Sequence, residues 1–271
     1  MRRSTRVDNR FDGRKAIVTG AGSGIGRATA LRLAAEGAHV VAIDVAAEGL
    51  TATSELAKAA TGSGLVSVRV ADISDETSVA EGVTAALEEL GGLDVLVNAA
   101  GILRSAHTHE LALDDWNQII GINLTGTFLM VRQCISALLE SSHAVIVNFS
   151  STSASFAHPY MSAYAASKGG IQSFTHAIAA EYAKQGIRAV CVAPGSISSG
   201  MTAAPGIPDD ADFTWFGRLT PALTPPPTDA DIDIPGMGGP EMVAGAIAML
   251  ASDDGAFITG TELRIDGGTH M

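Results

Sequence analysis

Short apolar stretches alternate along the chain with longer amphipathic ones. The apolar stretches, rich in valine, isoleucine and leucine, lie at residues 15–19, 39–43, 65–70, 94–97, 144–147, 188–193 and 261–265. Helical spacing of apolar positions predicts helices at about 25–37, 55–60, 76–90, 116–139, from about 164 onward, and at 241–250. Fully apolar strands separated by helices are typical of a buried parallel sheet. The pattern predicts the α/β class: a single doubly wound, Rossmann-like parallel sheet with helices on both faces, forming one domain over 11–271.

The first predicted strand runs directly into a glycine-rich turn and a helix. The candidate contacts in this turn are Gly20, Ser23, Gly24, Ile25 and Gly26. Glycines let the chain turn sharply and let its backbone approach a pyrophosphate, to which the helix N-terminus offers free N–H groups. A glycine pattern alone is often only a turn, but between a strand and a helix it favours dinucleotide binding.

The second predicted strand ends in Asp44, eighteen residues after Gly26. A carboxylate at this position accepts hydrogen bonds from the ribose hydroxyls of NAD and repels the 2′-phosphate of NADP. The nearby Ser23 and Val45 are uncharged, so no basic residue beside Asp44 favours NADP. The alternative is a solvated aspartate that opens the next loop.

The next two strands also end in candidate cofactor contacts. Asp72 and Ile73 are placed to bind an adenine edge through a carboxylate and a main-chain N–H, although either residue could equally belong to a helix cap formed by Ser74 or Asp75. Small residues close the following strand, which lets a ribose or a flat ring lie against the backbone; they are Asn98, Ala99, Ala100 and Gly101.

A tyrosine and a lysine four residues apart follow the strand at 144–147. If the helix has begun by Tyr164, Lys168 lies on the same face, and its ammonium is expected to lower the pKa of the phenol. Such a phenol is a plausible acid or base for a hydroxyl proton, and the Ser151 hydroxyl could hold the same oxygen. Taken alone, this pair is most often a solvated helix face. Asn123, inside an apolar helix, needs a polar partner if it is buried.

Composition narrows the classes of partner. The formal net charge of −12 opposes nucleic-acid or anionic-membrane binding. No apolar run reaches the roughly 18 residues of a membrane span, and the basic segment 1–10 lacks the apolar part of a secretion signal, so a flexible tail is expected there.

Cys134 and Cys191 are expected to be buried reduced thiols of a cytoplasmic protein. His107 and His109 have no matching ligands nearby, so we expect surface histidines and no metal site.

Residues 198–239 break the alternation of strands and helices. Proline and aspartate are frequent there, and no period is sustained. A long irregular segment within a compact domain is usually a lid, a binding loop or a disordered stretch. The cluster of Phe213, Trp215 and Phe216 favours a partly helical lid over an apolar substrate.

Together these segments resemble the short-chain dehydrogenase/reductase family over nearly the whole chain from Phe11 to Gly268. The motifs occur in the family's order: Thr19-Gly20…Gly24-Ile25-Gly26, Asp72, Asn98-Ala99-Ala100-Gly101, Asn123, Ser151, Tyr164…Lys168, Pro194-Gly195 and Asp266-Gly267-Gly268. Each motif is common by chance, whereas all of them in order are not.

The resemblance implies roles for four catalytic residues. Tyr164 is implied as the general acid/base, and Ser151 as the group that orients the substrate oxygen. Lys168 is implied to hold the nicotinamide ribose, and Asn123 to anchor a water in the proton path. The family's cofactor contacts further along the chain correspond to Pro194, Gly195, Ile197 and Ser199, with Ser199 standing where a threonine is usual.

The resemblance therefore predicts an NAD-dependent oxidoreductase that interconverts a secondary alcohol and a ketone on an apolar small molecule, assembled as a homotetramer. One alternative is an NADPH-dependent 3-oxoacyl-acyl-carrier-protein reductase, which Asp44 and the net charge oppose. The other is a nucleotide-binding protein without turnover, opposed by the presence of Ser151, Tyr164 and Lys168 together.

Overall fold

A single parallel sheet forms the centre of the molecule. The computed structural model describes residues 9–60, 62, 64–228 and 230–271, so nearly all of the predicted tail at 1–10 lies outside the described residues. The strands are β1 (Lys15–Thr19), β2 (His39–Asp44), β3 (Leu65–Val70), β4 (Val95–Asn98), β5 (Val145–Phe149), β6 (Arg188–Pro194) and β7 (Glu262–Ile265). They lie in the order β3-β2-β1-β4-β5-β6-β7, and all neighbours are parallel. The predicted fold class is confirmed.

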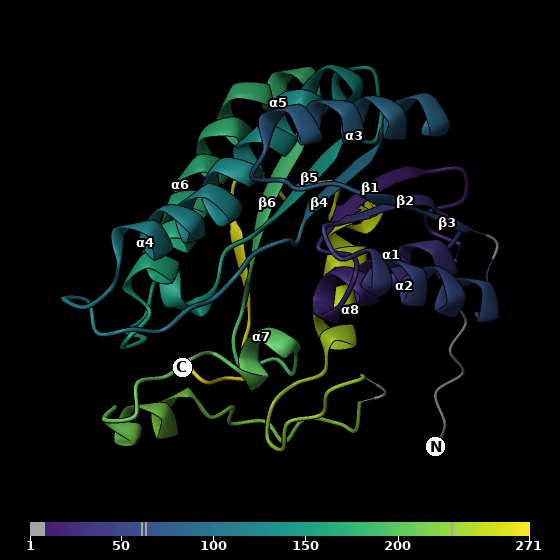
Figure 1. The fold of residues 1–271 in the computed structure, drawn as a ribbon. Helices are drawn as coiled ribbons and strands as arrows, with labels where there is room; N and C mark the ends of the chain where they lie inside the picture. Colours follow the sequence, from purple (N-terminus) through teal and green to yellow (C-terminus); the bar gives the residue numbers. More distant parts are fainter. Residues whose placement is uncertain (1–8, 61, 63, 229) are drawn as a thin grey trace.

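Helices cover both faces of this sheet (Figure 1). One face carries α1 (Gly24–Ala35), α2 (Ala47–Ala59) and α8 (Pro240–Ala251), and the other carries α3 (Glu76–Leu90), α5 (Gly126–Leu139) and α6 (Ser162–Tyr182). Successive strand residues alternate between the two cores: Val18 packs into the first and Ile17 into the second. Burial on both faces is why the inner strands β2, β1, β4, β5 and β6 are largely apolar, whereas the edge strands β3 and β7 are partly exposed.

Helix α2 is longer than its sequence pattern indicates. It begins at Ala47, about eight residues before the predicted start near residue 55. The reason is that this helix fully buries only Leu50 and Thr53, so its first half carries little apolar periodicity. The strands predicted at 94–97 and 261–265 each begin one residue later than predicted.

The helix predicted at 116–139 is present but not uniform. It runs from α4 (Leu113–Ile120) through a π-helical turn (Gly121–Thr125) into α5. By length and composition alone the stretch could cross a membrane, but 44% of its most apolar window is buried in this fold. Packing against α3, α6 and the sheet therefore accounts for the buried part of its apolar surface.

Polar side chains occupy one level of the sheet near its carboxyl edge. Thr19, Asn98, Asn148 and Cys191 are register partners on successive strands, and all four are buried. Asn98 Nδ2 donates to Asn148 Oδ1 at 2.9 Å, and Asn148 Nδ2 donates to Thr175 Oγ1 of α6 at 2.9 Å. This row of amides ties α6 to the strands beneath it.

Both cysteines are free and buried, as predicted. Burial raises the pKa of the Cys134 thiol to about 12 and that of Cys191 to about 11. Neither thiol is therefore ionised at neutral pH.

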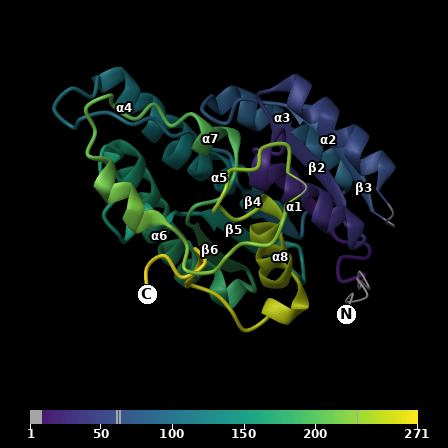
Figure 2. The ribbon, with the colours of Figure 1, turned by 90° about the horizontal axis from the view of Figure 1, so that it is seen from below.

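The segment 198–239, called the lid segment below, crosses the carboxyl edge of the sheet (Figure 2). It contains the short helix α7 (Gly200–Ala203) and a 3-10 turn at Phe213–Leu219 that carries the aromatic cluster. His107, expected at the surface, is half-buried: its Nε2 lies 2.9 Å from Asp210 Oδ1 of the lid segment, a hydrogen bond that raises the pKa of the imidazole. His109 is exposed as predicted.

Candidate active site

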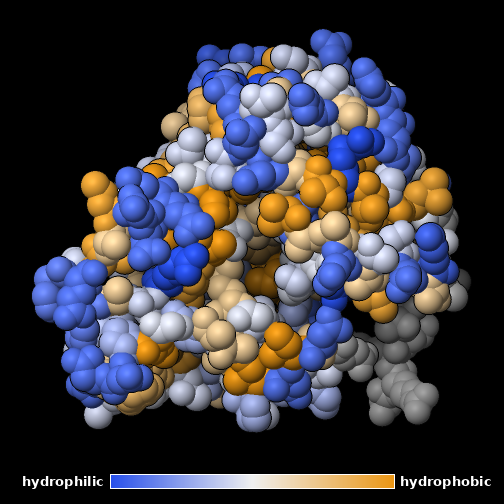
Figure 3. All heavy atoms as spheres, in the orientation of Figure 1, coloured by the Kyte–Doolittle hydropathy of each residue, from blue (hydrophilic) through white to orange (hydrophobic). Residues whose placement is uncertain are grey.

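A cavity of about 510 Å³ opens at the carboxyl edge of the sheet. It lies where the strand order reverses between β1 and β4, the position at which doubly wound sheets bind ligands. The face drawn in Figure 3 is hollowed near its middle, with hydrophobic atoms inside the hollow. The predicted residues that line the cavity are Gly20, Ser23, Gly24, Ile25, Gly26, Asp44, Asp72, Ile73, Ala99, Ala100, Gly101, Ser151, Tyr164, Lys168, Pro194, Gly195, Ile197 and Ser199.

The glycine-rich turn leaves no room for larger side chains. A Cβ on Gly20 would lie 2.8 Å from Ala100, and a Cβ on Gly26 only 2.1 Å from the Gly20 carbonyl oxygen. Ser23 precedes α1 without capping it through its side chain, so the N–H groups of the first turn keep their hydrogen-bonding capacity. This arrangement fits the pyrophosphate of a dinucleotide.

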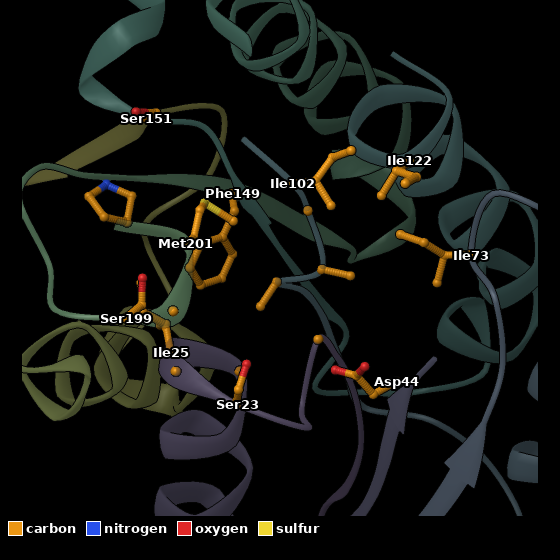
Figure 4. Close-up of a pocket in the computed structure, with 18 of the residues that line it drawn as sticks. Ser23, Ile25, Asp44, Ile73, Ile102, Ile122, Phe149, Ser151, Ser199 and Met201 are labelled. Carbon is orange, nitrogen blue, oxygen red and sulfur yellow. The ribbon is translucent and has the colours of Figure 1, made fainter. Parts of the chain in front are cut away.

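The end of the cavity that holds the glycine-rich turn also carries a fixed carboxylate. Asp44 accepts a hydrogen bond from Gly22 N at 2.9 Å and another from Ala46 N at 2.9 Å. These two bonds hold the side chain against the glycine-rich turn, at the end of β2. In Figure 4, Asp44 and Ser151 lie at opposite ends of the cavity, while Ile73, Ile102 and Ile122 gather along one side.

Asp72 is used mainly within its own loop. Its Oδ1 accepts hydrogen bonds from both the N–H (2.8 Å) and the hydroxyl (2.7 Å) of Ser74. The cap of α3 is Asp75, whose side chain accepts from Ser78 N, as one of the two alternatives predicted. Asp72 and Ile73 nevertheless line the cavity.

Helix α6 brings Tyr164 and Lys168 to the cavity. The helix begins at Ser162, so both residues lie within its first two turns, and Lys168 Nζ is 5.6 Å from the centre of the Tyr164 ring. The ammonium group also donates to the Phe149 carbonyl oxygen at 2.9 Å. Ser151 lies two residues after β5; its hydroxyl accepts from Ser153 N at 3.2 Å and lies close enough to the phenol to lower its pKa. The three polar groups therefore face one end of the cavity.

Burial, rather than the lysine charge, dominates the titration of this pair. It raises the pKa of Tyr164, and the hydrogen bond with Ser151 opposes the rise only in part. It also lowers the pKa of Lys168 to about 8. The expectation that Lys168 lowers the pKa of Tyr164 is wrong for this structure, because removing both groups from water disfavours both charges.

Asn123 lies behind the cavity wall and does not line it. Its Oδ1 accepts from Ile102 N at 2.8 Å, and its Nδ2 donates to Ile102 O and to Ser167 Oγ, each at 3.0 Å. Ser167 in turn donates to the Tyr164 carbonyl at 2.7 Å. The side chain therefore joins the segment after Gly101 to the second turn of α6, and both amide hydrogens are used within the protein. That Asn123 anchors a water stays a prediction.

Replacing Asn123 by alanine is expected to destabilise the protein by about 1–3 kcal/mol, because Ile102 N–H and C=O lose their buried partner. Urea denaturation measures this change, and Asn117→Ala, an exposed asparagine of α4, is the matched control with an expected effect within about 0.5 kcal/mol. Equal stabilities of the two variants would contradict the bridging role of Asn123.

Asn98 is buried below the cavity floor. That Asn98 belongs to the cofactor site stays a prediction, but its side chain points along the sheet to Asn148 and does not line the cavity. The reason is the alternation of a strand: Asn98 still belongs to β4, and its side chain faces the helix layer that contains α6. The residues after it, from Ala99 onward, do line the cavity.

The last predicted contacts follow β6. Gly195 packs so closely on the turn after β7 that a Cβ would lie 2.6 Å from the Asp266 Cβ. Ile197 pairs with Gly238 of the lid segment. Ser199 caps α7, its hydroxyl accepting from Thr202 N at 3.3 Å, so this hydroxyl already has a partner within the protein.

Several lining residues were not predicted from the sequence. Ile102 continues the small-residue segment, and Met201 and Thr202 belong to α7. Gln118 and Ile122 are four residues apart and so share the helix face that looks into the cavity. This spacing is the signal that could have found them.

The described residues contain no cluster of three or more histidine, cysteine or carboxylate side chains able to hold a metal ion. The polar side chains that line the cavity include a phenol, an amine, several hydroxyls, the amide of Gln118 and the carboxylates of Asp44 and Asp72. This set suits proton transfer beside a bound organic cofactor.

Known proteins are similar to this chain over almost its full length. Residues 14–206 match the family profile described as short chain dehydrogenase. The 3-oxoacyl-acyl-carrier-protein reductase FabG of Thermotoga maritima is 36% identical over 260 residues, covering 96% of this chain and 98% of that protein. The cis-4-hydroxycyclohexanecarboxylate dehydrogenase of Sinomonas cyclohexanicum is 40% identical over 260 residues, covering 95% and 97%.

The fold is similar to solved structures as well. A dehydrogenase/reductase from Sinorhizobium meliloti 1021 superposes with a TM-score of 0.84 at 32% identity, covering 98% of each chain.

Proposed function

The chain belongs to the short-chain dehydrogenase family, and the relatives named above are oxidoreductases. We propose that this protein interconverts a secondary alcohol and a ketone with NAD. The observation that carries the reaction is the convergence of Ser151, Tyr164 and Lys168 on one end of a cavity whose other end carries the glycine-rich turn and Asp44.

The proton chemistry falls to these side chains. A bound nicotinamide supplies or accepts the hydride at the substrate carbon. Tyr164 gives its phenolic proton to the ketone oxygen in reduction and takes the hydroxyl proton in oxidation, while Ser151 donates a hydrogen bond to the same oxygen. Lys168 holds the ribose hydroxyls and places a positive charge beside the phenolate. Because burial raises the pKa of Tyr164, oxidation should become faster as the pH rises.

The choice of NAD rests on Asp44. Its carboxylate is held at the end of β2 by Gly22 N and Ala46 N, where it can accept the ribose hydroxyls and repel a 2′-phosphate. The rival, a 3-oxoacyl-acyl-carrier-protein reductase using NADPH, draws support from the similarity to the Thermotoga maritima protein. Asp44 and the net charge of −12 count against it.

Asp44→Ser is expected to lower the preference for NAD over NADP by about tenfold or more, since the repulsion of a 2′-phosphate is removed. The measurement is kcat/KM for both cofactors across a panel of cyclic and acyclic secondary alcohols. If the wild-type enzyme prefers NADP, the NADPH-dependent 3-oxoacyl-acyl-carrier-protein reductase becomes the better assignment. Tight NADH binding by wild type without turnover of any alcohol or ketone would support the non-catalytic alternative.

The substrate is proposed to be an apolar alcohol, with a cyclic secondary alcohol as the first choice. The name of the Sinomonas cyclohexanicum relative supports a ring. Ile102 and Ile122 on one side of the cavity support an apolar surface.

The remaining expectations are also proposals. Residues 11–271 would act as one domain with 198–239 as its lid, in a cytoplasmic homotetramer that binds neither membrane nor nucleic acid. Exposed apolar side chains support an assembly: on α4 and α5 they include Leu113, Trp116 and Phe128, and Phe257 is fully exposed before β7.

A further inference from the structure

Arg27 joins three parts of the structure around the glycine-rich turn. It lies in the first turn of α1, and only 13% of its side chain is exposed. The guanidinium donates to the Gly22 carbonyl, to Thr53 Oγ1 of α2 at 3.1 Å, and to Asp231 of the lid segment. Arg27 does not line the cavity. Its positive charge is therefore held next to the dinucleotide pocket but outside it.

Asp231 is the carboxylate that meets this charge. Its side chain is 74% exposed and forms an ion pair with Arg27 of α1. The sequence shows many acidic residues in the lid segment, and the mechanism above uses none of them. Asp231 gives one of them a defined partner on the body of the protein.

Gly22 links the Arg27–Asp231 ion pair to Asp44 at the ribose end of the pocket. The Gly22 N–H donates to Asp44, and the Gly22 carbonyl accepts from Arg27. A Cβ on Gly22 would lie 2.9 Å from the Asp44 carboxylate, so this turn is closely packed. Arg27 and Asp44 therefore both bind Gly22 of the glycine-rich turn, and the lid segment is connected to Gly22 through Arg27.

We propose that Asp231 is a positioning residue of the dinucleotide pocket: through Arg27 it fastens the lid segment to the glycine-rich turn and so slows release of the bound dinucleotide. The lid segment crosses the carboxyl edge of the sheet, and its residues 199–202 line the cavity, so the proposal requires that this segment move when a dinucleotide leaves. This inference rests on the proposed binding of NAD in that cavity.

The test is NADH release from the full chain. Protein loaded with NADH is mixed with excess NAD in a stopped-flow instrument, and NADH fluorescence gives the dissociation rate. Asp231→Asn is expected to raise that rate about three- to fivefold, the range of an ion pair with one exposed partner, with the association rate changed less than about twofold. Because the contact is ionic, about 1 M salt should bring wild type close to the variant.

Two further variants separate positioning from a general effect of charge. Asp233→Asn removes the same charge two residues away, at an exposed position for which the described structure gives no side-chain hydrogen bond or ion pair, and should release NADH as wild type does. Asp231→Glu keeps the carboxylate and should restore most of the slow release. A structural role in folding alone would change thermal stability without this difference in release rate.

Equal release by Asp231→Asn and wild type would overturn the inference, as would slower release, which would mean that freeing Arg27 attracts the phosphates. An equal acceleration by Asp233→Asn would overturn it too. Failure of wild type to bind NADH at all would instead overturn the proposed function, and this inference with it.

Discussion

Tyr164→Phe is expected to reduce turnover to below about 1% of wild type while leaving NADH affinity nearly unchanged. Positioned acid–base catalysis contributes about 10²–10⁴ to a rate, and the described cavity offers no second phenol to replace Tyr164. The ring itself stays, so the packing at the start of α6 is preserved. Alcohol oxidation with NAD and ketone reduction with NADH measure the loss in both directions.

The matched control is Tyr182→Phe, the same chemical change at the far end of the same helix. It should alter turnover by less than about twofold. A Tyr164→Phe enzyme that retained more than a few per cent of the wild-type rate would remove Tyr164 from its role as the acid/base.

Lys168→Met is expected to abolish turnover and yet stabilise the folded protein. Burial lowers the pKa of Lys168 to about 8, whereas an unfolded lysine titrates near 10.4. Below pH 8 the folded protein therefore carries the full cost of a buried ammonium, about 3 kcal/mol. Loss of the hydrogen bond to the Phe149 carbonyl offsets about 1 kcal/mol of the gain.

The pH dependence distinguishes this account from better packing of methionine. Between pH 8 and about 10.4 the unfolded chain binds more protons than the folded one, so wild-type stability rises with pH and the advantage of the variant shrinks. Urea denaturation at pH 7 and pH 10 measures the difference, with Lys184→Met, an exposed lysine after α6, as the control. An advantage that stayed constant between these pH values would contradict a buried charge as its source.

The fold was largely predictable because its inner strands are buried on both faces. Each predicted strand was found with its start within one residue and its end within two, since apolar runs bounded by turns leave little choice of state. Helix α2 was placed less well because it rests on only two fully buried side chains. Helical periodicity weakens when most of a helix faces solvent.

The candidate site was predictable to the extent that it depends on residues near strand ends. The glycine-rich turn, Asp44 and the pair on α6 all reach the cavity because the carboxyl ends of parallel strands share one edge.

The direction of the Asn98 side chain depended on where β4 ends, which the sequence left open by one residue. The raised pKa of Tyr164 depended on burial, which spacing does not report. The contact of Arg27 with Asp231 joins residues about 200 positions apart and has no local signal.

The row of amides across the sheet also restricts how this chain can vary over evolution. Asn98 and Asn148 are both buried, and each amide has the other as a partner. Changing one asparagine alone leaves the other amide buried without a partner, which lowers the stability of the fold. Changing both to apolar residues of similar shape can leave the stability nearly unchanged. Thr175 is linked in the same way to Asn148. These three positions should therefore drift as a group, and a sequence that has lost one asparagine should be found to have replaced its neighbours too.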